Sequence, residues 1–373
     1  MIVLAIVFWI SAGLLAFTHV GYPLLLGALT RGRARSWSFS TDSPMVSLVI
    51  AAHDEEAVIE AKVANALELD YPRDRLEIIV ASDGSGDRTV ERARAAGADV
   101  VLDLPRLGKT AAQNAAVERS AGEIVAFSDA NSIWRSNALR RLVDRLSEEP
   151  VGYVCGQVVF HDAEGDNQEG LYWRYEMWVR ERESLLEGVT AGNGAIYAIR
   201  REAYVALEPT GSHDLSLPPA LTKRGWQCVY EPSARADEKL VPTLESEFAR
   251  KRRMMRGLWD VLVGEGMLSM RGYTPLYAFE VLSHRGIRYA SPLLHLLALA
   301  TNVALLGHGP IYTVTLVAQL ALLVAAALAG VVPAKPLRIA RYYVLVTASI
   351  AAGFWDRMRL GPQAAWEKAE GAR

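Results

Sequence analysis

Ile124-Val125-Ala126-Phe127-Ser128-Asp129-Ala130-Asn131-Ser132 is the stretch that decides the predicted fold. Its first four residues are apolar, as in a strand buried in a parallel sheet, and an acid, a small residue and an amide follow. Ligands of open α/β sheets bind where such strands end. Asp129 and Asn131 are therefore candidate oxygen ligands for a hard cation, Mg²⁺ or Mn²⁺. A turn that only caps the next helix is the alternative interpretation.

Short apolar strands and helical stretches alternate on both sides of this segment. Strands are expected at 45–52, 76–81, 99–102, 152–160 and 226–230, and residues 192–201 are expected to form a glycine loop that runs into a strand, with helices between most of these strands. Such alternation predicts βαβ units and an α/β, Rossmann-like fold with a mixed, mainly parallel sheet.

Bulk composition sets limits on the function of the 373 residues. A formal net charge of −2 gives no reason to expect nucleic acid as a partner. The two cysteines, Cys155 and Cys228, form no disulfide or zinc spacing and lie in apolar strand-like segments. They are predicted to be buried free thiols.

Uncharged apolar runs at both ends predict a membrane protein. Residues 1–30 are long enough to cross a bilayer, and Pro23 would kink this anchor or mark its end. The basic cluster Arg31, Arg33 and Arg35 follows, which places the amino terminus outside and the rest in the cytoplasm. A retained anchor is favoured over a secretory signal peptide because the start is uncharged.

The remaining chain divides by composition into a cytoplasmic domain and further membrane segments. A catalytic domain is predicted at 44–260 and an interfacial segment at 261–288. A transmembrane hairpin at 289–333, a short third membrane segment at 340–356 and a tail at 357–373 are predicted to follow. The apolar part of the third segment, 342–355, is short for a span, so a tilted crossing and an interfacial or re-entrant segment both stay open.

Polar side chains follow four of the expected strands and helix starts. They are His53-Asp54-Glu55, Asp83, Lys109 and Asp129. Because the carboxyl ends of parallel strands meet in one crevice, we expect these side chains to lie close together. Asp83 could bind a base or ribose, Lys109 a phosphate and Asp129 a cation, so together they predict a nucleotide-diphosphate site. Ordinary turn chemistry and a solvated surface lysine are the alternatives. The patterns of phosphate-binding and dinucleotide-binding loops are absent from the sequence, which disfavours an ATPase or a dinucleotide enzyme.

The sequence resembles the inverting, membrane-associated glycosyltransferases of family two, the group that contains cellulose, chitin, hyaluronan and poly-N-acetylglucosamine synthases. The resemblance covers roughly Val46 to Arg256 and rests on motifs in the family's order: VSLVIAAHDEE, IIVASDGSGD, RLGKTAAQNAA, IVAFSDANS, GNGAIYAIRR, HDLSLP and RKRRM. It implies a nucleotide-sugar domain of the A-type glycosyltransferase fold, flanked by transmembrane helices.

The resemblance also implies roles for residues on the donor side. Residues Ala52 to Glu55, including His53, match the loop that contacts the nucleotide, and Asp83 matches the aspartate that holds uracil or ribose. Lys109 matches a nucleotide-binding lysine. Asp129 and Asn131 match the D-x-D segment, with an amide where many members carry the second acid. A divalent cation is the implied cofactor.

On the acceptor side, the resemblance makes Asp214 the general base, although its neighbour His213 departs from the usual acid. Gly192, Asn193 and Gly194 match an acceptor-side glycine segment. The basic helix near residue 250 matches the Q-x-x-R-W segment and retains its arginine as Arg253, but Arg250 and Met254 replace the glutamine and the tryptophan. The lost tryptophan puts long-polymer synthesis in doubt. A basic surface that faces anionic lipid is the other interpretation of this helix.

The expected function is transfer of a sugar from a nucleotide diphosphate donor, with a UDP-sugar expected, to a hydroxyl of a lipid or glycan, with inversion. The expected location is a bacterial inner or plasma membrane, with membrane lipids as partners and the catalytic domain in the cytoplasm. A processive polysaccharide synthase and a non-catalytic nucleotide-sugar sensor are the alternatives.

Overall fold

The computed structural model describes residues 1–33, 43–161, 169–239, 244–332 and 334–362. Residues 34–42, 162–168, 240–243 and 333 and most of the expected tail, from residue 363 on, lie outside the described residues.

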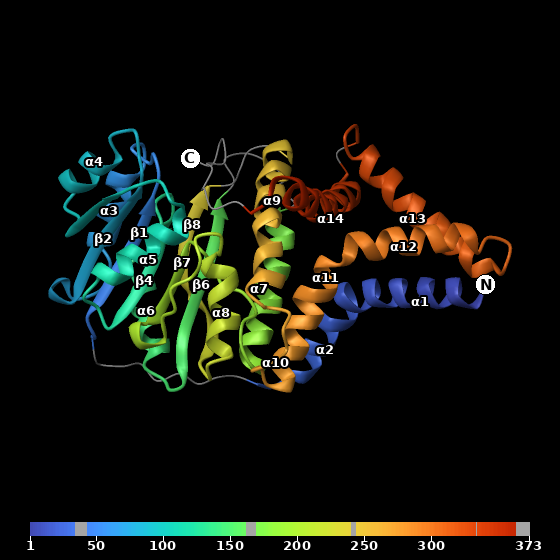
Figure 1. Ribbon diagram of the computed structural model, residues 1–373, viewed down its shortest axis with the longest axis horizontal. Helices are drawn as coiled ribbons and strands as arrows, with labels where there is room; N and C mark the ends of the chain where they lie inside the picture. Colours follow the sequence, from blue (N-terminus) through green and yellow to red (C-terminus); the bar gives the residue numbers. More distant parts are fainter. Residues whose placement is uncertain (34–42, 162–168, 240–243, 333, 363–373) are drawn as a thin grey trace.

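An eight-stranded sheet forms the centre of the domain, in the order β3-β2-β1-β4-β7-β6-β8-β5 (Figure 1). The strands are β1 Val46–Ala52, β2 Leu76–Asp83, β3 Val100–Leu104, β4 Ile124–Asp129, β5 Ile133–Trp134, β6 Val151–His161, β7 Ile196–Arg200 and β8 Gln227–Lys239. The first four pair in parallel, and β6 is parallel to β8. β7 runs antiparallel to β4 and β6, and β5 runs antiparallel to β8. The predicted mixed, mainly parallel α/β sheet is confirmed.

Helices cover both faces of the sheet, which explains why β1 is buried along its whole length. Leu48 and Ile50 pack on one face with helices α3 and α6, whereas Val49 packs on the other with α5 and α8. The helices of the domain are α3 Ile59–Leu67, α4 Thr89–Ala95, α5 Lys109–Arg119, α6 Ala138–Leu146, α7 Glu169–Leu186, α8 His213–Thr222 and α9 Leu244–Trp259. Cys155 and Cys228 are buried free thiols in the second core, as predicted.

Apolar helices project from the end of the domain that carries α7 and α9 (Figure 1). A helical run comprises α1 Ile2–Ala16, a π-helical turn Phe17–Gly21 and α2 Tyr22–Leu29, and α2 runs in a different direction from α1 (Figure 1). After α10 Pro275–Glu280 and α11 Ile287–Tyr289, the chain forms α12 Ser291–Ala304 and α13 Pro310–Leu328.

Two helical runs among the described residues, Ile2–Leu29 and Pro310–Leu328, are long and apolar enough to cross a membrane. Length and composition alone support this, because buried core helices and signal sequences pass the same test. The first arm of the expected hairpin is shorter than its composition suggested. α12 has 14 residues, or roughly 21 Å, against a hydrocarbon core of about 30 Å.

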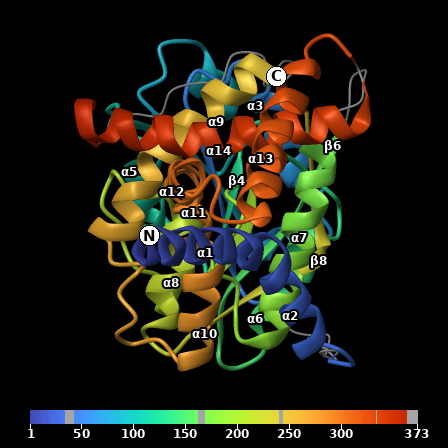
Figure 2. The same cartoon turned by 90° about the vertical axis from the view of Figure 1, so that its right-hand side faces the viewer.

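The short third segment expected at 340–356 is part of a 26-residue helix, α14 Lys335–Leu360. Figure 1 shows α14 nearly end-on and α1 from the side, so the two helices are not parallel, and Figure 2 shows α14 along its length. Arg252 of α9 pairs with Asp356 at 2.6 Å, and Arg357 pairs at 2.6 Å with Asp260 of the π-helical turn that follows α9. These two pairs fasten α14 to α9 and to that turn. Gly353 allows the close crossing, since a Cβ there would lie 2.6 Å from Cβ of Met255.

Candidate active site

Asp129 ends β4 at the carboxyl edge of the sheet, in register with Ala51 of β1. Its carboxylate forms an ion pair with Nζ of Lys109, the first residue of α5. Burial acts to lower the pKa of Lys109, but the carboxylate of Asp129 outweighs it and the pKa is raised. The lysine therefore stays charged beside the acid.

Asp83 ends β2 and is almost fully buried. Its carboxylate accepts hydrogen bonds from the backbone N–H groups of Leu107, at 2.8 Å, and Gly108, at 2.9 Å. Gly108 has a φ of +103°, which only glycine adopts readily. Asp83 therefore sets the position at which α5 and Lys109 begin. Because a carboxylate can accept more than these bonds, its predicted contact with the nucleotide stays open.

The loop after β1 is joined to the loop after β2. Nδ1 of His53 hydrogen-bonds with the carbonyl oxygen of Asp83 at 2.8 Å, and the backbone N–H of Glu55 donates to Oγ1 of Thr89 at 2.7 Å. Asp54, at a φ of +50°, accepts from the backbone N–H of Gly86. Ala52, His53 and Glu55 thus lie at the edge of the sheet beside Asp83, as predicted for one crevice.

A cavity of about 210 Å³ opens between the start of α5, the segment before α8, and α9. It brings together residues that are up to 149 positions apart in the sequence, from Lys109 to Leu258. Its polar lining includes Lys109, Asp214 and Arg253, and Gly194 also contributes. Met254 and Gly257 complete the wall that α9 presents. Four of the predicted site residues thus line one cavity: Lys109, Gly194, Asp214 and Arg253.

Asp214 lies in the first turn of α8, where its carboxylate accepts a hydrogen bond from the hydroxyl of Ser212. Its neighbour His213 also lines the cavity, but its side chain is almost fully buried. It is buried among aromatic rings that include Phe127, and its Nδ1 hydrogen-bonds with the hydroxyl of Tyr197 at 2.8 Å. Burial and the charge of Lys109 lower the pKa of His213 to about 3, so it is neutral. Asp214 is the acid that this helix presents to the cavity.

The glycine segment before β7 contributes through its backbone. A Cβ at Gly192 would lie 1.8 Å from Oη of Tyr153, and the backbone N–H of Gly192 donates to the carbonyl oxygen of Asp214 at 2.6 Å. Asn193 turns away and donates from Nδ2 to the carbonyl oxygen of Gly156. A Cβ at Gly194 would lie 3.8 Å from both the carboxyl carbon of Asp214 and Nζ of Lys109.

Gly192→Ala should lower the free energy of unfolding by about 1–3 kcal/mol, because the added methyl group overlaps the buried hydroxyl of Tyr153. Gly194→Ala is the matched control, because its methyl group meets only ordinary van der Waals contacts. Thermal unfolding of the purified variants measures the difference. Equal melting temperatures would contradict this geometry, and Tyr153→Phe should partly rescue Gly192→Ala.

The two arginines predicted on α9 face different parts of the site. Arg253 lines the cavity with Asp214, whereas Arg250 lies close enough to Glu238 of β8 to act on its pKa. Burial and the charge of Asp129 raise the pKa of Glu238 to about 7. Arg250 therefore lies toward the Asp129 side, and its predicted acceptor role stays a prediction.

The oxygen groups near Asp129 fit a divalent cation. Asp129 and Asn131 offer a carboxylate and an amide oxygen, and Oε1 of Glu238 is buried with no hydrogen-bond partner among the described residues. In the part of the chain that the structure describes, no three acidic, histidine or cysteine side chains gather as a metal centre. A cation here would therefore be shared with oxygens of a ligand.

A buried support beneath this turn escaped the sequence analysis. Lys62 of α3 is fully buried and donates from Nζ to the carbonyl oxygen of Ser132 at 2.6 Å. Three residues later, Asn65 hydrogen-bonds with the backbone N–H and carbonyl of Trp134. The indole of Trp134 then donates to the carbonyl oxygen of Ala195 at 3.0 Å, which connects the Asp129 turn to the glycine segment. The available signal was Lys62 itself, a charge on the apolar face of an amphipathic helix.

Residues 47–207 match the sequence model of the family described as Glycosyl transferase family 2. This segment, the family 2 domain, is therefore similar to the glycosyltransferases of that family. Asp83, Lys109, Asp129 and the glycine segment lie inside the matched residues, whereas Asp214 and Arg253 follow them.

Similar proteins extend this likeness beyond the family 2 domain. The chain is 28% identical over 294 residues to the β-monoglucosyldiacylglycerol synthase of Trichormus variabilis, which covers 71% of this chain and 62% of the relative. It therefore spans somewhat less than two thirds of that relative. It is 25% identical over 289 residues to an N-acetylglucosaminyltransferase of Rhizobium meliloti, with 69% and 67% covered.

Among solved structures, the mannosyltransferase PcManGT of Pyrobaculum calidifontis, in complex with GDP-Man and Mn²⁺, superposes with a TM-score of 0.70. The identity is 23%, and the alignment covers 94% of this chain and 99% of that one. This similarity shows that the two chains share a fold, including the helices outside the family 2 domain.

Proposed function

We propose that this protein is a membrane-bound, inverting glycosyltransferase that moves a sugar from a nucleotide diphosphate donor to a hydroxyl group of a lipid. The observation that carries the proposal is the convergence of Lys109, Asp214 and Arg253 on one cavity beside Asp129. Lys109 and Arg253 supply positive charge for the phosphates of the donor, and Asp214 supplies a carboxylate. A glycosyl transfer needs both kinds of group.

Asp214 acts as the general base in this proposal. An acceptor hydroxyl is a poor nucleophile near neutral pH, so Asp214 takes its proton as the oxygen attacks the anomeric carbon of the sugar. A positioned base contributes about 10²–10⁴-fold in rate. The bond to the nucleotide diphosphate breaks on the opposite face, and this single displacement inverts the anomeric configuration.

Lys109 and Arg253 stabilise the negative charge that develops on the leaving diphosphate. Asp129 and Asn131 would hold a divalent cation, Mg²⁺ or Mn²⁺, which neutralises the same oxygens when bound. Asp83, with Ala52, His53 and Glu55, lies where the nucleoside would reach along the sheet edge. The similar mannosyltransferase is in complex with GDP-Man and Mn²⁺, which supports the use of a divalent cation.

The names of the relatives support a lipid acceptor more than a growing polysaccharide. The Trichormus relative is named as a diacylglycerol glycolipid synthase, and Met254 stands in this cavity where the processive synthases carry a tryptophan. Extension of a glycan chain, with Gly192 to Gly194 on the acceptor side, is the second candidate. A non-catalytic sensor would not need both Asp129 and Asp214.

Two apolar helical runs support the membrane location. We infer that α1 and α13 cross the bilayer and that α14, which lies across the direction of α1, rests at its cytoplasmic surface (Figures 1 and 2). Residues 44–260 would then form the cytoplasmic catalytic domain.

A donor panel tests the proposal. The full-length protein, purified in detergent with Mn²⁺ and a membrane lipid extract, should release nucleotide diphosphate from one UDP- or GDP-sugar and transfer its sugar to lipid. Mass spectrometry of the products distinguishes addition of one sugar from a polymer series. If no donor in the panel yields nucleotide above a heat-inactivated control, the enzymatic proposal is wrong.

A further inference from the structure

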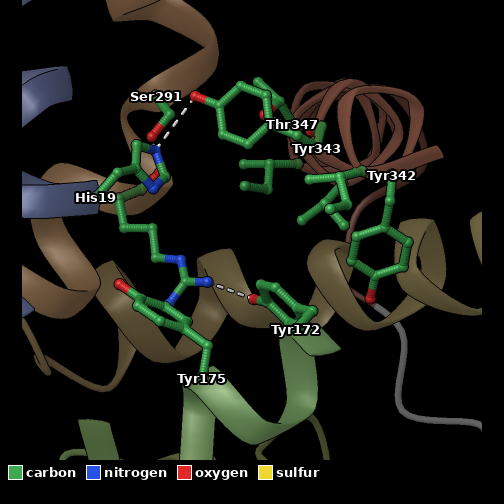
Figure 3. Close-up of a pocket in the computed structure, with 11 residues that line it drawn as sticks. His19, Tyr172, Tyr175, Ser291, Tyr342, Tyr343 and Thr347 are labelled. Atoms are coloured by element: carbon green, nitrogen blue, oxygen red, sulfur yellow. Dashed lines mark hydrogen bonds between the residues drawn. The ribbon is translucent and has the colours of Figure 1, made fainter. Parts of the chain in front are cut away.

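A second cavity of about 210 Å³ lies where the family 2 domain meets the apolar helices (Figure 3). Its walls come from five separate elements: the π-helical turn after α1, α7, α11, α12 and α14. The residues that line it are His19, Tyr172, Tyr175, Arg288, Ser291, Ile339, Tyr342, Tyr343, Val346, Thr347 and Ile350. No step of the proposed transfer uses this cavity.

The lining fits a hydrocarbon chain. α14 contributes the aliphatic side chains of Ile339, Val346 and Ile350, and the tyrosines of α7 and α14 contribute their rings. Cavities of about 150 Å³ with such walls already admit a guest as large as benzene. This cavity therefore has room for a segment of an acyl chain, but not for a whole lipid.

The polar groups inside the cavity are largely satisfied by each other. Arg288 forms an ion pair with Glu176 and donates to the hydroxyl of Tyr172 (Figure 3). Burial would raise the pKa of Glu176, but Arg288 and His284 hold it well below its usual range, so the pair is ionised and neutral overall. The hydroxyl of Tyr343 hydrogen-bonds with Nε2 of His295 at 2.7 Å. The interior therefore offers little to a charged group.

A positive charge lies against the outside of the same rings. Nζ of Lys251, on the basic helix α9, is 5.5 Å from the ring centroid of Tyr172 and 5.6 Å from that of Tyr342. These two rings are neighbours, with centroids 5.4 Å apart, and both line the cavity. An apolar cavity beside a lysine matches the two ends of an anionic amphiphile.

The second cavity is separate from the proposed catalytic one. Leu258 lines the catalytic cavity and Ile350 lines the second, and both belong to one apolar cluster that lies between them. A molecule in the second cavity therefore does not reach Asp214.

We propose that this second cavity binds an anionic glycerophospholipid, with an acyl segment against α14 and the phosphate at Lys251. The site holds the basic helix α9, and so Arg253, at the membrane surface. This inference rests on the membrane location proposed above, but not on the transferase chemistry.

The experiment compares two lipids that differ only in the phosphate. Full-length protein in detergent is titrated with phosphatidic acid and with diacylglycerol of the same chains, each carrying a photoactivatable diazirine in one chain, and the labelled peptides are mapped. Val346→Trp fills the cavity, and Val317→Trp on the exposed face of α13 is its matched control. Lys251→Met removes the charge. Nucleotide release from the donor panel is measured on the same samples.

The wild-type protein should be labelled in residues 339–350 by phosphatidic acid at concentrations about tenfold lower than by diacylglycerol. Val346→Trp should remove this labelling while Val317→Trp keeps it, and Lys251→Met should erase the preference between the lipids without erasing the labelling. Equal labelling by both lipids, labelling that ignores Val346→Trp, or competition by millimolar inorganic phosphate would each overturn the proposal. If Val346→Trp does not fold, the preference of Lys251→Met between the two lipids decides whether the proposal holds. Labelling without nucleotide release would contradict the proposed transferase activity but not the lipid site. Nucleotide release without labelling would contradict the lipid site but not the transferase activity.

Discussion

Asp214→Asn should lower the rate of sugar transfer by about 10²–10⁴-fold while nucleotide binding stays within a few fold of the wild-type value. The amide has the shape of the acid and can still accept a hydrogen bond from Ser212. It cannot take a proton from the acceptor hydroxyl, however, so the loss should appear in kcat. Transfer rates under saturating donor, together with calorimetric binding of UDP or GDP with Mn²⁺, separate the two quantities.

The control for Asp214→Asn is Glu202→Gln, which neutralises an exposed acid after β7. It should leave both transfer and nucleotide binding unchanged. An Asp214→Asn variant that keeps most of its turnover would remove Asp214 as the base, whatever its stability.

Lys109→Met should have opposite effects on two ligands. The lysine ammonium pairs with Asp129, so a cation must compete with it for that carboxylate. Loss of a charge-assisted hydrogen bond is worth about 1.5–3 kcal/mol. Mn²⁺ alone should therefore bind about tenfold or more tightly to Lys109→Met, whereas the nucleotide diphosphate, which loses a cationic partner, should bind more weakly by a similar factor.

Asp129→Asn is the reciprocal variant, because it keeps the lysine and removes the charged oxygen ligand. It should lose Mn²⁺ binding measured by electron paramagnetic resonance in the presence of nucleotide. If Lys109→Met weakened the binding of Mn²⁺ and of the nucleotide alike, the lysine would not compete with the cation for the Asp129 carboxylate. Because both readouts are binding, they do not depend on knowing the acceptor.

The parts of this fold that could be predicted from sequence are those in which local pattern and burial agree. β1 and β4 are short, wholly apolar strands between turn residues, so their place inside a parallel sheet followed directly. The ends of longer elements were harder. β8 continues to Lys239 past Pro232, because it pairs with both β6 and β5. That pairing is a tertiary fact that a local window does not contain.

The candidate site divides in the same way. Asp129 could be located because it follows an apolar strand, and Asp214 because it lies in the motif HDLSLP. The hydrogen bonds between Asp83 and the start of α5 could not be predicted from the sequence. They depend on the positive φ of Gly108, which lies 25 residues later in the chain. α14 was read as a short apolar segment because Arg341 and Arg357 interrupt its hydropathy. Its full length is stabilised by ion pairs to α9, which no pattern within residues 335–360 encodes.

The fastening of α14 to α9 has a practical consequence for handling this protein. Arg253 and Met254 lie on a helix whose outer side is covered by residues from the far end of the chain, through Arg252 to Asp356 and through the close crossing at Gly353. A shortened chain that ends before residue 334, made to obtain a water-soluble enzyme, would keep every proposed catalytic residue and yet lose the support of the cavity wall. Solubilisation with the carboxyl-terminal helix retained is the route by which activity should survive purification.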